Sequence, residues 1–75
     1  MKTLEQLENF LLSPNHNVTA SRFRWMLRGR NIPFREGWET SENEEYIFEL
    51  IDEPDTWFLF ESEEGEFLAI AQFEL

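Results

Sequence analysis

Four of the five arginines in the chain lie between positions 22 and 30, although the formal net charge of the chain is −10. Trp25 stands three residues from both Arg22 and Arg28, a spacing that makes side chains neighbours on a helix. Guanidinium groups bind phosphates and guanine, and they also stack on an indole ring. Arg22, Arg24, Trp25 and Arg28 are therefore the candidate residues of a nucleic-acid-binding helix within the segment 19–30.

The second half of the chain is strongly acidic. Residues 36–75 contain fourteen Asp and Glu residues and neither lysine nor arginine. Such a surface keeps a small protein soluble, and it also suits recognition by a basic protein partner. In the second interpretation the carboxylates imitate the phosphates of DNA and occupy the basic groove of a nucleic-acid-binding protein. The candidate residues of this acidic surface are Glu44, Glu45, Asp52, Glu53, Asp55, Glu63, Glu64 and Glu66.

The residue types used in catalysis and metal binding are scarce. His16 is the only histidine, and the chain has no cysteine, which excludes disulfides and thiolate metal ligands. The three glycines are spread out and form no phosphate-binding loop. The acidic run 52–55 lacks the length and spacing of a dedicated calcium loop. We therefore expect a protein that is not an enzyme and that has no cofactor and no metal site.

Two helices are expected in the first part of the chain. Apolar residues recur at helical spacing through residues 3–12, and Pro14 ends that pattern. A second helix is predicted in the segment 19–30, with Asn17 or Thr19 as its N-terminal cap. The apolar side of this helix consists of Ala20, Phe23, Met26 and Leu27, and its outward side of Arg24, Trp25 and Arg28.

The rest of the chain has the pattern of antiparallel strands. Three segments are rich in aromatic and branched residues and are predicted as strands: 45–52, 56–62 and 66–73. Residues 32–39 are a candidate for a further strand, which Pro33 restricts to an edge. We expect turns at 53–55 and before residue 66, with Gly65 available for a positive φ. The fold class is α+β, a single domain over 1–75 with two N-terminal helices packed on a three- or four-stranded antiparallel β-meander.

Both faces of the predicted sheet are apolar. Residues 57–60 are all aromatic or leucine, whereas a sheet wetted on one side alternates between apolar and polar residues. In the last strand, the residues expected to share one face are Phe67, Ala69, Ala71 and Phe73. Two short helices cover only one face. Either the sheet curves around the helices, or a homodimer or another protein covers the second face.

These observations favour a non-catalytic protein-binding module, a small acidic regulator or inhibitor with a basic partner, of which a DNA mimic is one form. The arginines then serve mainly as counter-charge for the acidic sheet. The alternative is a nucleic-acid-binding protein that uses the arginine-rich helix 19–30. The sequence shows no signal peptide and no apolar run of about 20 residues, so we expect a cytoplasmic protein without a membrane partner.

Overall fold

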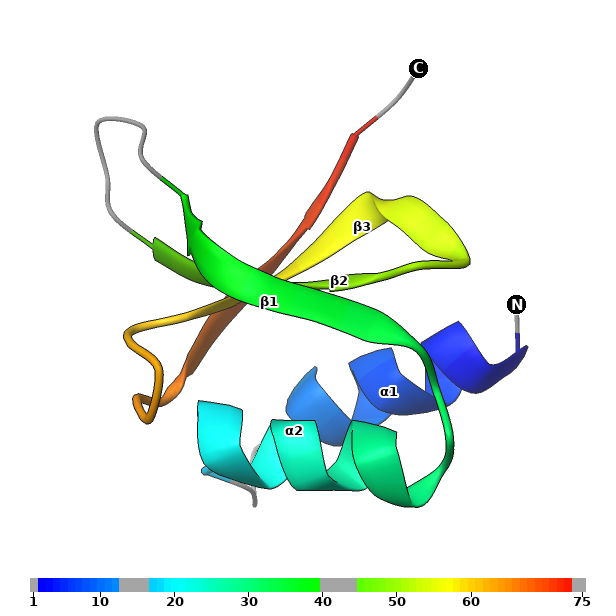
Figure 1. Cartoon of the computed structure of the whole chain (residues 1–75), viewed down its shortest axis with the longest axis horizontal. Helices are drawn as coiled ribbons and strands as arrows, with labels where there is room; N and C mark the ends of the chain where they lie inside the picture. Colours follow the sequence, from blue (N-terminus) through cyan, green and yellow to red (C-terminus); the bar gives the residue numbers. More distant parts are fainter. Residues whose placement is uncertain (1, 13–16, 40–44, 74–75) are drawn as a thin grey trace.

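The computed structural model describes residues 2–12, 17–39 and 45–73. Its elements are α1 (Lys2–Leu12), α2 (Ala20–Gly29), β1 (Phe34–Glu39), β2 (Glu45–Leu50), β3 (Glu53–Phe60) and β4 (Phe67–Gln72). The strands form one antiparallel sheet in the order β1-β2-β3-β4, and both helices lie on the same side of it (Figure 1). The predicted α+β fold is confirmed in its four-stranded form, with β1 at an edge.

The helix α2 begins and ends where the sequence predicts. The Thr19 hydroxyl accepts a hydrogen bond of 3.2 Å from the backbone N–H of Arg22, which makes Thr19 the N-terminal cap. Beyond the helix, Asn31 has a φ of 56°, a conformation that asparagine adopts more readily than most residues. The buried side chains of the helix recur at spacings of three and four, and they are Ala20, Phe23 and Leu27.

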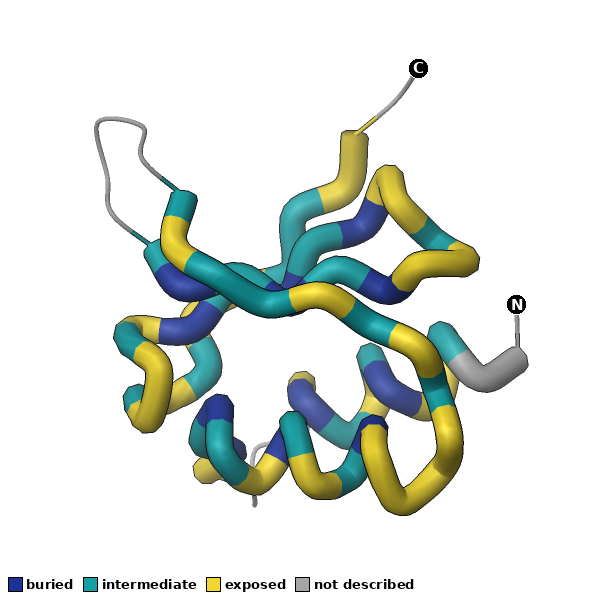
Figure 2. Tube along the Cα trace, viewed as in Figure 1, coloured by how far each residue is buried: buried dark blue, intermediate teal, exposed yellow. Residues whose placement is uncertain are grey.

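The core lies between the helices and the face of the sheet that we name the inner face (Figure 2). Its centre is Phe23, whose ring centroid lies 5.3 Å from that of Phe48, 5.1 Å from that of Phe58 and 5.4 Å from that of Phe60. From α1, Leu7 and Leu11 complete this buried cluster. Within the described ranges, no helix has the length and apolar character needed to cross a membrane.

The β2–β3 connection differs from the predicted one. The turn lies at residues 51–52, and β3 already begins at Glu53, so a turn at 53–55 is wrong. Glu49 pairs with Trp57 whereas the next residue, Leu50, pairs with Glu53. The intervening residues of β3 therefore bulge out of the ladder, and a bulge is a position in which a sheet tolerates a proline such as Pro54.

The register of β4 also departs from strict alternation. The pairing with β3 shifts by one residue around Leu68, which is an extra residue without a partner on β3. Phe67 and Ile70 therefore both pack against the core. Ala69 and Ala71 lie on the opposite face, so the prediction that they share a face with Phe67 is wrong.

The turn between β3 and β4 docks on the start of α2. The Gly65 carbonyl accepts a hydrogen bond of 2.8 Å from the Ala20 N–H, and Thr19 forms an antiparallel bridge with Glu66. The predicted positive φ of Gly65 is wrong, because none of the glycines adopts one. Glycine is required here for space, since an added Cβ would lie 2.6 Å from the Ser62 hydroxyl oxygen and 2.7 Å from its backbone nitrogen.

We predict that Gly65→Ala destabilises the fold by about 1–3 kcal/mol, because the backbone of Ser62 must shift to admit the new methyl group. The thermal unfolding midpoint should fall by about 4–8 °C for each kcal/mol lost. The control is Gly37→Ala, since an added Cβ meets no atom within 4 Å there. Equal midpoints for the two variants in a thermal melt followed by circular dichroism would contradict the close-packing role of Gly65.

Candidate functional site

Arg24 lies at the boundary between α2 and the sheet rather than outward. Its Nε donates to both carboxylate oxygens of Glu36, at 2.9 and 2.8 Å, and its Nη2 lies 2.7 Å from one of them. The same Nη2 donates to the backbone carbonyl of Glu63 at 3.2 Å. Only 14% of the Arg24 side chain is exposed. The prediction that Arg24 points outward is therefore wrong, because its long side chain reaches back to a strand that the helix covers.

The hydroxyl of Tyr46 donates a hydrogen bond to Glu36 and completes this cluster. The hydrogen bond from Arg24 lowers the pKa of Glu36 below its ordinary value, and the same contact raises the pKa of Arg24. Burial raises the pKa of Tyr46 to about 12, and its hydrogen bond to Glu36 adds to the shift. At neutral pH the cluster therefore holds a charged pair and a protonated tyrosine, which join the helix layer to β1 and β2.

The exposed side of α2 carries a row that we name the α2 stripe: Arg22, Trp25 and Arg28. Trp25, which the helical spacing places on the outward side, is 67% exposed, and the guanidinium carbon of Arg28 lies 5.9 Å from its ring centroid. Among the residues that the structure describes, the arginines that form salt bridges are Arg24 and Arg35. The arginines of the α2 stripe make no ion pair with a described carboxylate. Among the described residues, the expected pairing with the acidic sheet is therefore direct for Arg24, while the charge of Arg28 acts on Glu36 without an ion pair and helps to lower its pKa.

The predicted acidic residues fall into two groups at opposite ends of the sheet (Figure 1). One group lies at the β2–β3 turn and consists of Asp52, Glu53 and Asp55; the other lies at the opposite end and consists of Glu45, Glu63, Glu64 and Glu66. Glu44 lies outside the described residues. Antiparallel hairpins place successive turns at alternate ends of a sheet, so the two groups lie apart from each other. Across the described ranges, no three carboxylate or histidine side chains are grouped to hold a metal ion.

The face of the sheet turned away from the helices, the outer face, carries an apolar row across all four strands. The register aligns this row as Gly37, Ile47, Leu59 and Ala69. The neighbouring row is aligned as Arg35, Glu49, Trp57 and Ala71. No helix in the described part of the chain covers these residues, because both helices lie on the inner face. Ala69 is exposed and the other three residues of its row are partly exposed, so within the described part of the chain the outer face is a solvent-facing surface with an apolar centre.

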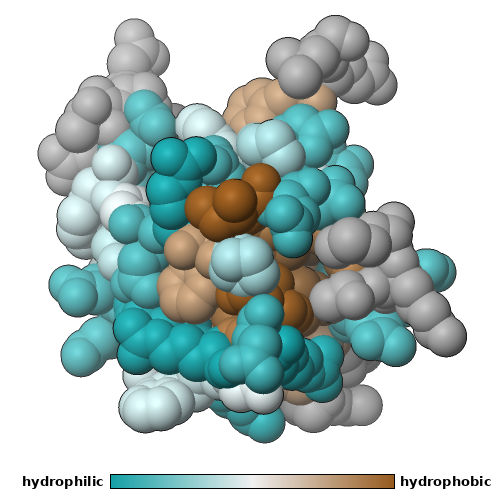
Figure 3. All heavy atoms as spheres, turned by 45° about the vertical axis from the view of Figure 1, so that its right-hand side comes forward, coloured by the Kyte–Doolittle hydropathy of each residue, from teal (hydrophilic) through white to brown (hydrophobic). Residues whose placement is uncertain are grey.

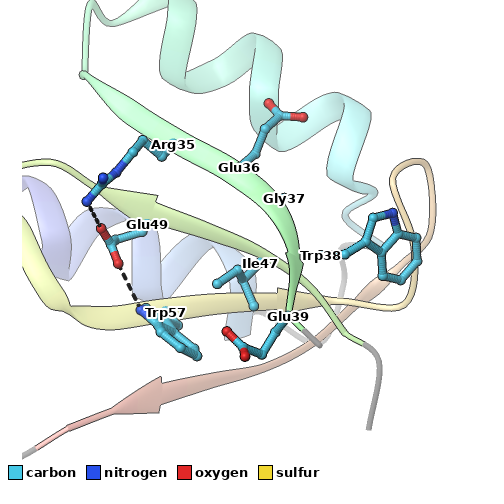
Figure 4. A pocket seen from close by; sticks show the side chains of 8 residues that line it. All are labelled: Arg35, Glu36, Gly37, Trp38, Glu39, Ile47, Glu49 and Trp57. Atoms are coloured by element: carbon cyan, nitrogen blue, oxygen red, sulfur yellow. Dashed lines mark hydrogen bonds and ion pairs between the residues drawn. The ribbon is translucent and has the colours of Figure 1, made fainter. Parts of the chain in front are cut away.

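Glu49 and Trp57 are tied together in the middle of the outer face. The Glu49 carboxylate accepts a hydrogen bond of 2.6 Å from Arg35 Nη2 and one of 3.1 Å from Trp57 Nε1. These residues line a shallow hollow together with Ile47 and Glu39, whereas the side chains of Glu36 and Trp38 at its edge point away from it (Figure 4). The hydrogen bond from Trp57 Nε1 orients the indole, and the one from Arg35 holds the carboxylate that accepts it.

A second hollow also borders Trp57, and we name it the Trp57–Phe73 hollow. It has a volume of about 430 Å³ and is lined by Glu49, Pro54, Asp55, Trp57 and Phe73. The two aromatic rings meet edge to face, with centroids 4.7 Å apart and planes at 71°. Phe73 is 42% exposed, so this aromatic corner is open to solvent.

Apolar exposure also occurs at the edges of the molecule. The exposed large apolar side chains of the described residues are Leu12, Trp25, Trp38, Ile51, Leu68 and Phe73. Figure 3 shows apolar side chains gathered in the middle of the side on which the β2–β3 turn lies, within a hydrophilic surround. Ile51, in that turn, is 45% exposed.

The sequence alone does not single out the residues of the outer face as site residues. Trp57, Phe73, Arg35 and Glu49 come from four separate stretches, and only the strand register brings them together. The sequence nevertheless contains a signal for this surface. The strands are apolar on both faces, and the two helices can cover only one face. That pattern predicts a second, open apolar face without locating its centre.

We predict that Glu36→Gln lowers the free energy of unfolding by about 1–3 kcal/mol, because the partly buried Arg24 loses its charged partner. Folding lowers the pKa of Glu36 below its ordinary 4.5, so the pair contributes fully above about pH 4.5 and its contribution is lost as the pH falls through the folded-state pKa. The stability difference between wild type and variant should therefore shrink in acid.

Urea unfolding at several pH values measures this difference. The control is Arg35→Gln, since the Arg35 side chain is 73% exposed and such surface pairs contribute about 0–1 kcal/mol. A Glu36→Gln variant that is as stable as Arg35→Gln at pH 7 would show that the cluster does not hold the layers together.

Comparisons with known proteins give no family assignment. The chain matched no protein-family model, no curated protein and no solved structure. The function must therefore be inferred from the geometry of two surfaces, the α2 stripe and the outer face.

Proposed function

We propose that the protein is a non-catalytic protein-binding module and that its outer face is the contact surface. The observation that carries this proposal is the uncovered row Gly37, Ile47, Leu59 and Ala69, which crosses all four strands without a charged side chain. Protein interfaces commonly have an apolar, charge-depleted core and a polar rim. Trp57, held by Glu49 beside this row, has the residue type that most often dominates binding energy at an interface.

The charges around this apolar centre favour a basic partner. Glu39 and Glu45 face each other at one end of the outer face, and Asp55 lies at the other. The one cation in the neighbouring row, Arg35, is already paired with Glu49. A partner with a positively charged rim would gain both attraction during encounter and specificity against other proteins. A second copy of the chain would instead bring two acidic rims together.

This surface suits a small acidic regulator or inhibitor. Such a protein would cover the basic surface of its target, which in the strongest form of the proposal is the nucleic-acid-binding groove of a DNA- or RNA-binding protein. The apolar centre would then supply apolar contact area to the target, which the phosphates of a nucleic acid do not offer. A cytoplasmic location is part of the proposal and is supported by the absence of cysteine from the sequence.

A second candidate function is the binding of single-stranded nucleic acid by the α2 stripe, which the 67% exposure of Trp25 favours. An exposed indole offers a stacking platform for a base, and Arg22 and Arg28 on either side offer contacts for phosphates. The net charge of −10 opposes this function, because it repels a polyanion at long range.

We predict that Ala69→Arg strongly weakens binding to basic proteins, because it places a positive charge at the exposed end of the apolar row. Like charges at an interface cost several kcal/mol, so retention should fall at least about tenfold. Immobilised wild type and variant are compared for the basic proteins that they retain from a native lysate, identified by mass spectrometry.

The control is Asn9→Arg, which makes the same change of charge at an exposed position of α1. Asn9→Arg should retain the same basic proteins as the wild type. If the wild type retains no basic protein, or if Ala69→Arg retains the wild-type set, the outer face is not the binding surface that we propose.

The second candidate function predicts that single-stranded oligonucleotides quench the fluorescence of Trp25. Three exposed arginines (22, 28 and 30) imply about three phosphate contacts and a slope of about −2 in a plot of log K against log salt. Arg28→Gln should weaken binding, whereas Arg35→Gln, on the opposite side of the molecule, should not. The absence of quenching up to about 1 mM oligonucleotide would exclude this function, because non-specific binding is ordinarily tighter than that.

A further inference from the structure

We infer that the Trp57–Phe73 hollow takes a cationic side chain, an arginine or a lysine, from the partner protein. This inference rests on the proposed function, since it names the group that the outer face would recognise. It draws on three features of the hollow: its aromatic corner, its carboxylates and its apolar floor.

The aromatic corner provides aromatic surface for a cation. The rings of Trp57 and Phe73 lie 4.7 Å apart at 71° to each other, and both line the hollow. The face of an aromatic ring carries negative charge in its quadrupole and attracts ammonium and guanidinium groups, most strongly when the ring is an indole. Because the Trp57 Nε1–H is bound to Glu49, the indole is held in place before a ligand arrives.

The carboxylates of the hollow differ in what they already bind. Glu49 accepts hydrogen bonds from both Arg35 and Trp57, so its role is to position the indole. Asp55 is exposed, and its carboxylate forms no salt bridge with any described residue. Asp55, which is one of the lining residues, therefore supplies a carboxylate that is free to pair with an incoming cation.

The apolar floor of the hollow selects the shape of the ligand. Pro54 and the two aromatic rings make the lining largely apolar, which suits the aliphatic stem of arginine or lysine while its charged end meets Asp55. An anionic group would be repelled by the carboxylates. A purely apolar side chain would cover Asp55 without pairing its charge, which is unfavourable.

The test uses the indole N–H signals of the intact protein in NMR spectra, each assigned by its disappearance in a Trp→Phe variant. The probes are N-acetyl-arginine methylamide and N-acetyl-lysine methylamide, with N-acetyl-citrulline methylamide as the neutral counterpart of arginine. We expect a saturable, millimolar shift of the Trp57 signal with at least one cationic probe and none with citrulline. The Trp25 signal serves as the internal reference for unspecific stacking.

Variants assign the shift to the hollow. Asp55→Asn and Phe73→Leu should each weaken binding of the cationic probe by about two- to fivefold, the loss expected for one exposed ion pair or one cation–π contact. Asp52→Asn is the matched control, because Asp52 lies in the same turn but does not line the hollow. It should bind the probe like the wild type.

Three results would overturn the inference: no shift of Trp57 with any probe, an equal shift with citrulline, or equal shifts of Trp25 and Trp57. None of them would affect the retention of basic proteins or its loss in Ala69→Arg. Failure of the hollow as a cation site is thus distinguishable from failure of the outer face as a binding surface.

Discussion

The packing of Phe23 against the inner face of the sheet is the interaction on which the rest of the structure depends. Its fully buried ring touches three sheet phenylalanines at centroid distances of 5.1–5.4 Å. A ring of this size, removed from water on all sides, fixes both the position and the rotation of the ten-residue helix that carries it. Because α1 packs on the same face, both described helices lie on one face of the sheet. The outer face is open as a direct consequence.

The rotation set by Phe23 also separates the charges of the molecule. It brings Arg24 to the edge of the sheet, where a two-pronged contact with Glu36 and the hydroxyl of Tyr46 offset the cost of removing charges from water. It leaves Trp25 and Arg28 in solvent on the far side of the helix. The basic groups that form no ion pair with a described residue therefore lie on the helix layer, whereas Glu39, Glu45 and Asp55 lie at the ends of the outer face. The two candidate functions thus use opposite sides of the molecule.

The local features of this arrangement could be predicted from the sequence, and the long-range ones could not. Helical periodicity predicts the burial of Phe23 and the exposure of Trp25, because both depend only on the angle between successive residues. The prediction for Arg24 is wrong because this residue lies next to the buried side of the helix. There, the length of its side chain and the position of Glu36 decide in which direction the guanidinium group points. The extra residue at Leu68 changes which side chains of β4 face the core. No local sequence pattern predicts this extra residue.

The outer face depends on the same long-range pairing, which also sets its pattern of charge. In a chain with 29% charged residues, an exposed sheet face would ordinarily carry charges along every strand. Here one row has none, and the ion pair of Arg35 and Glu49 neutralises the next, so the net negative charge is displaced to the ends of the strands. A surface that only kept the protein soluble would need no such arrangement. Under the proposed function, an apolar centre within an acidic rim disfavours a second copy of a chain of charge −10 and favours a basic partner.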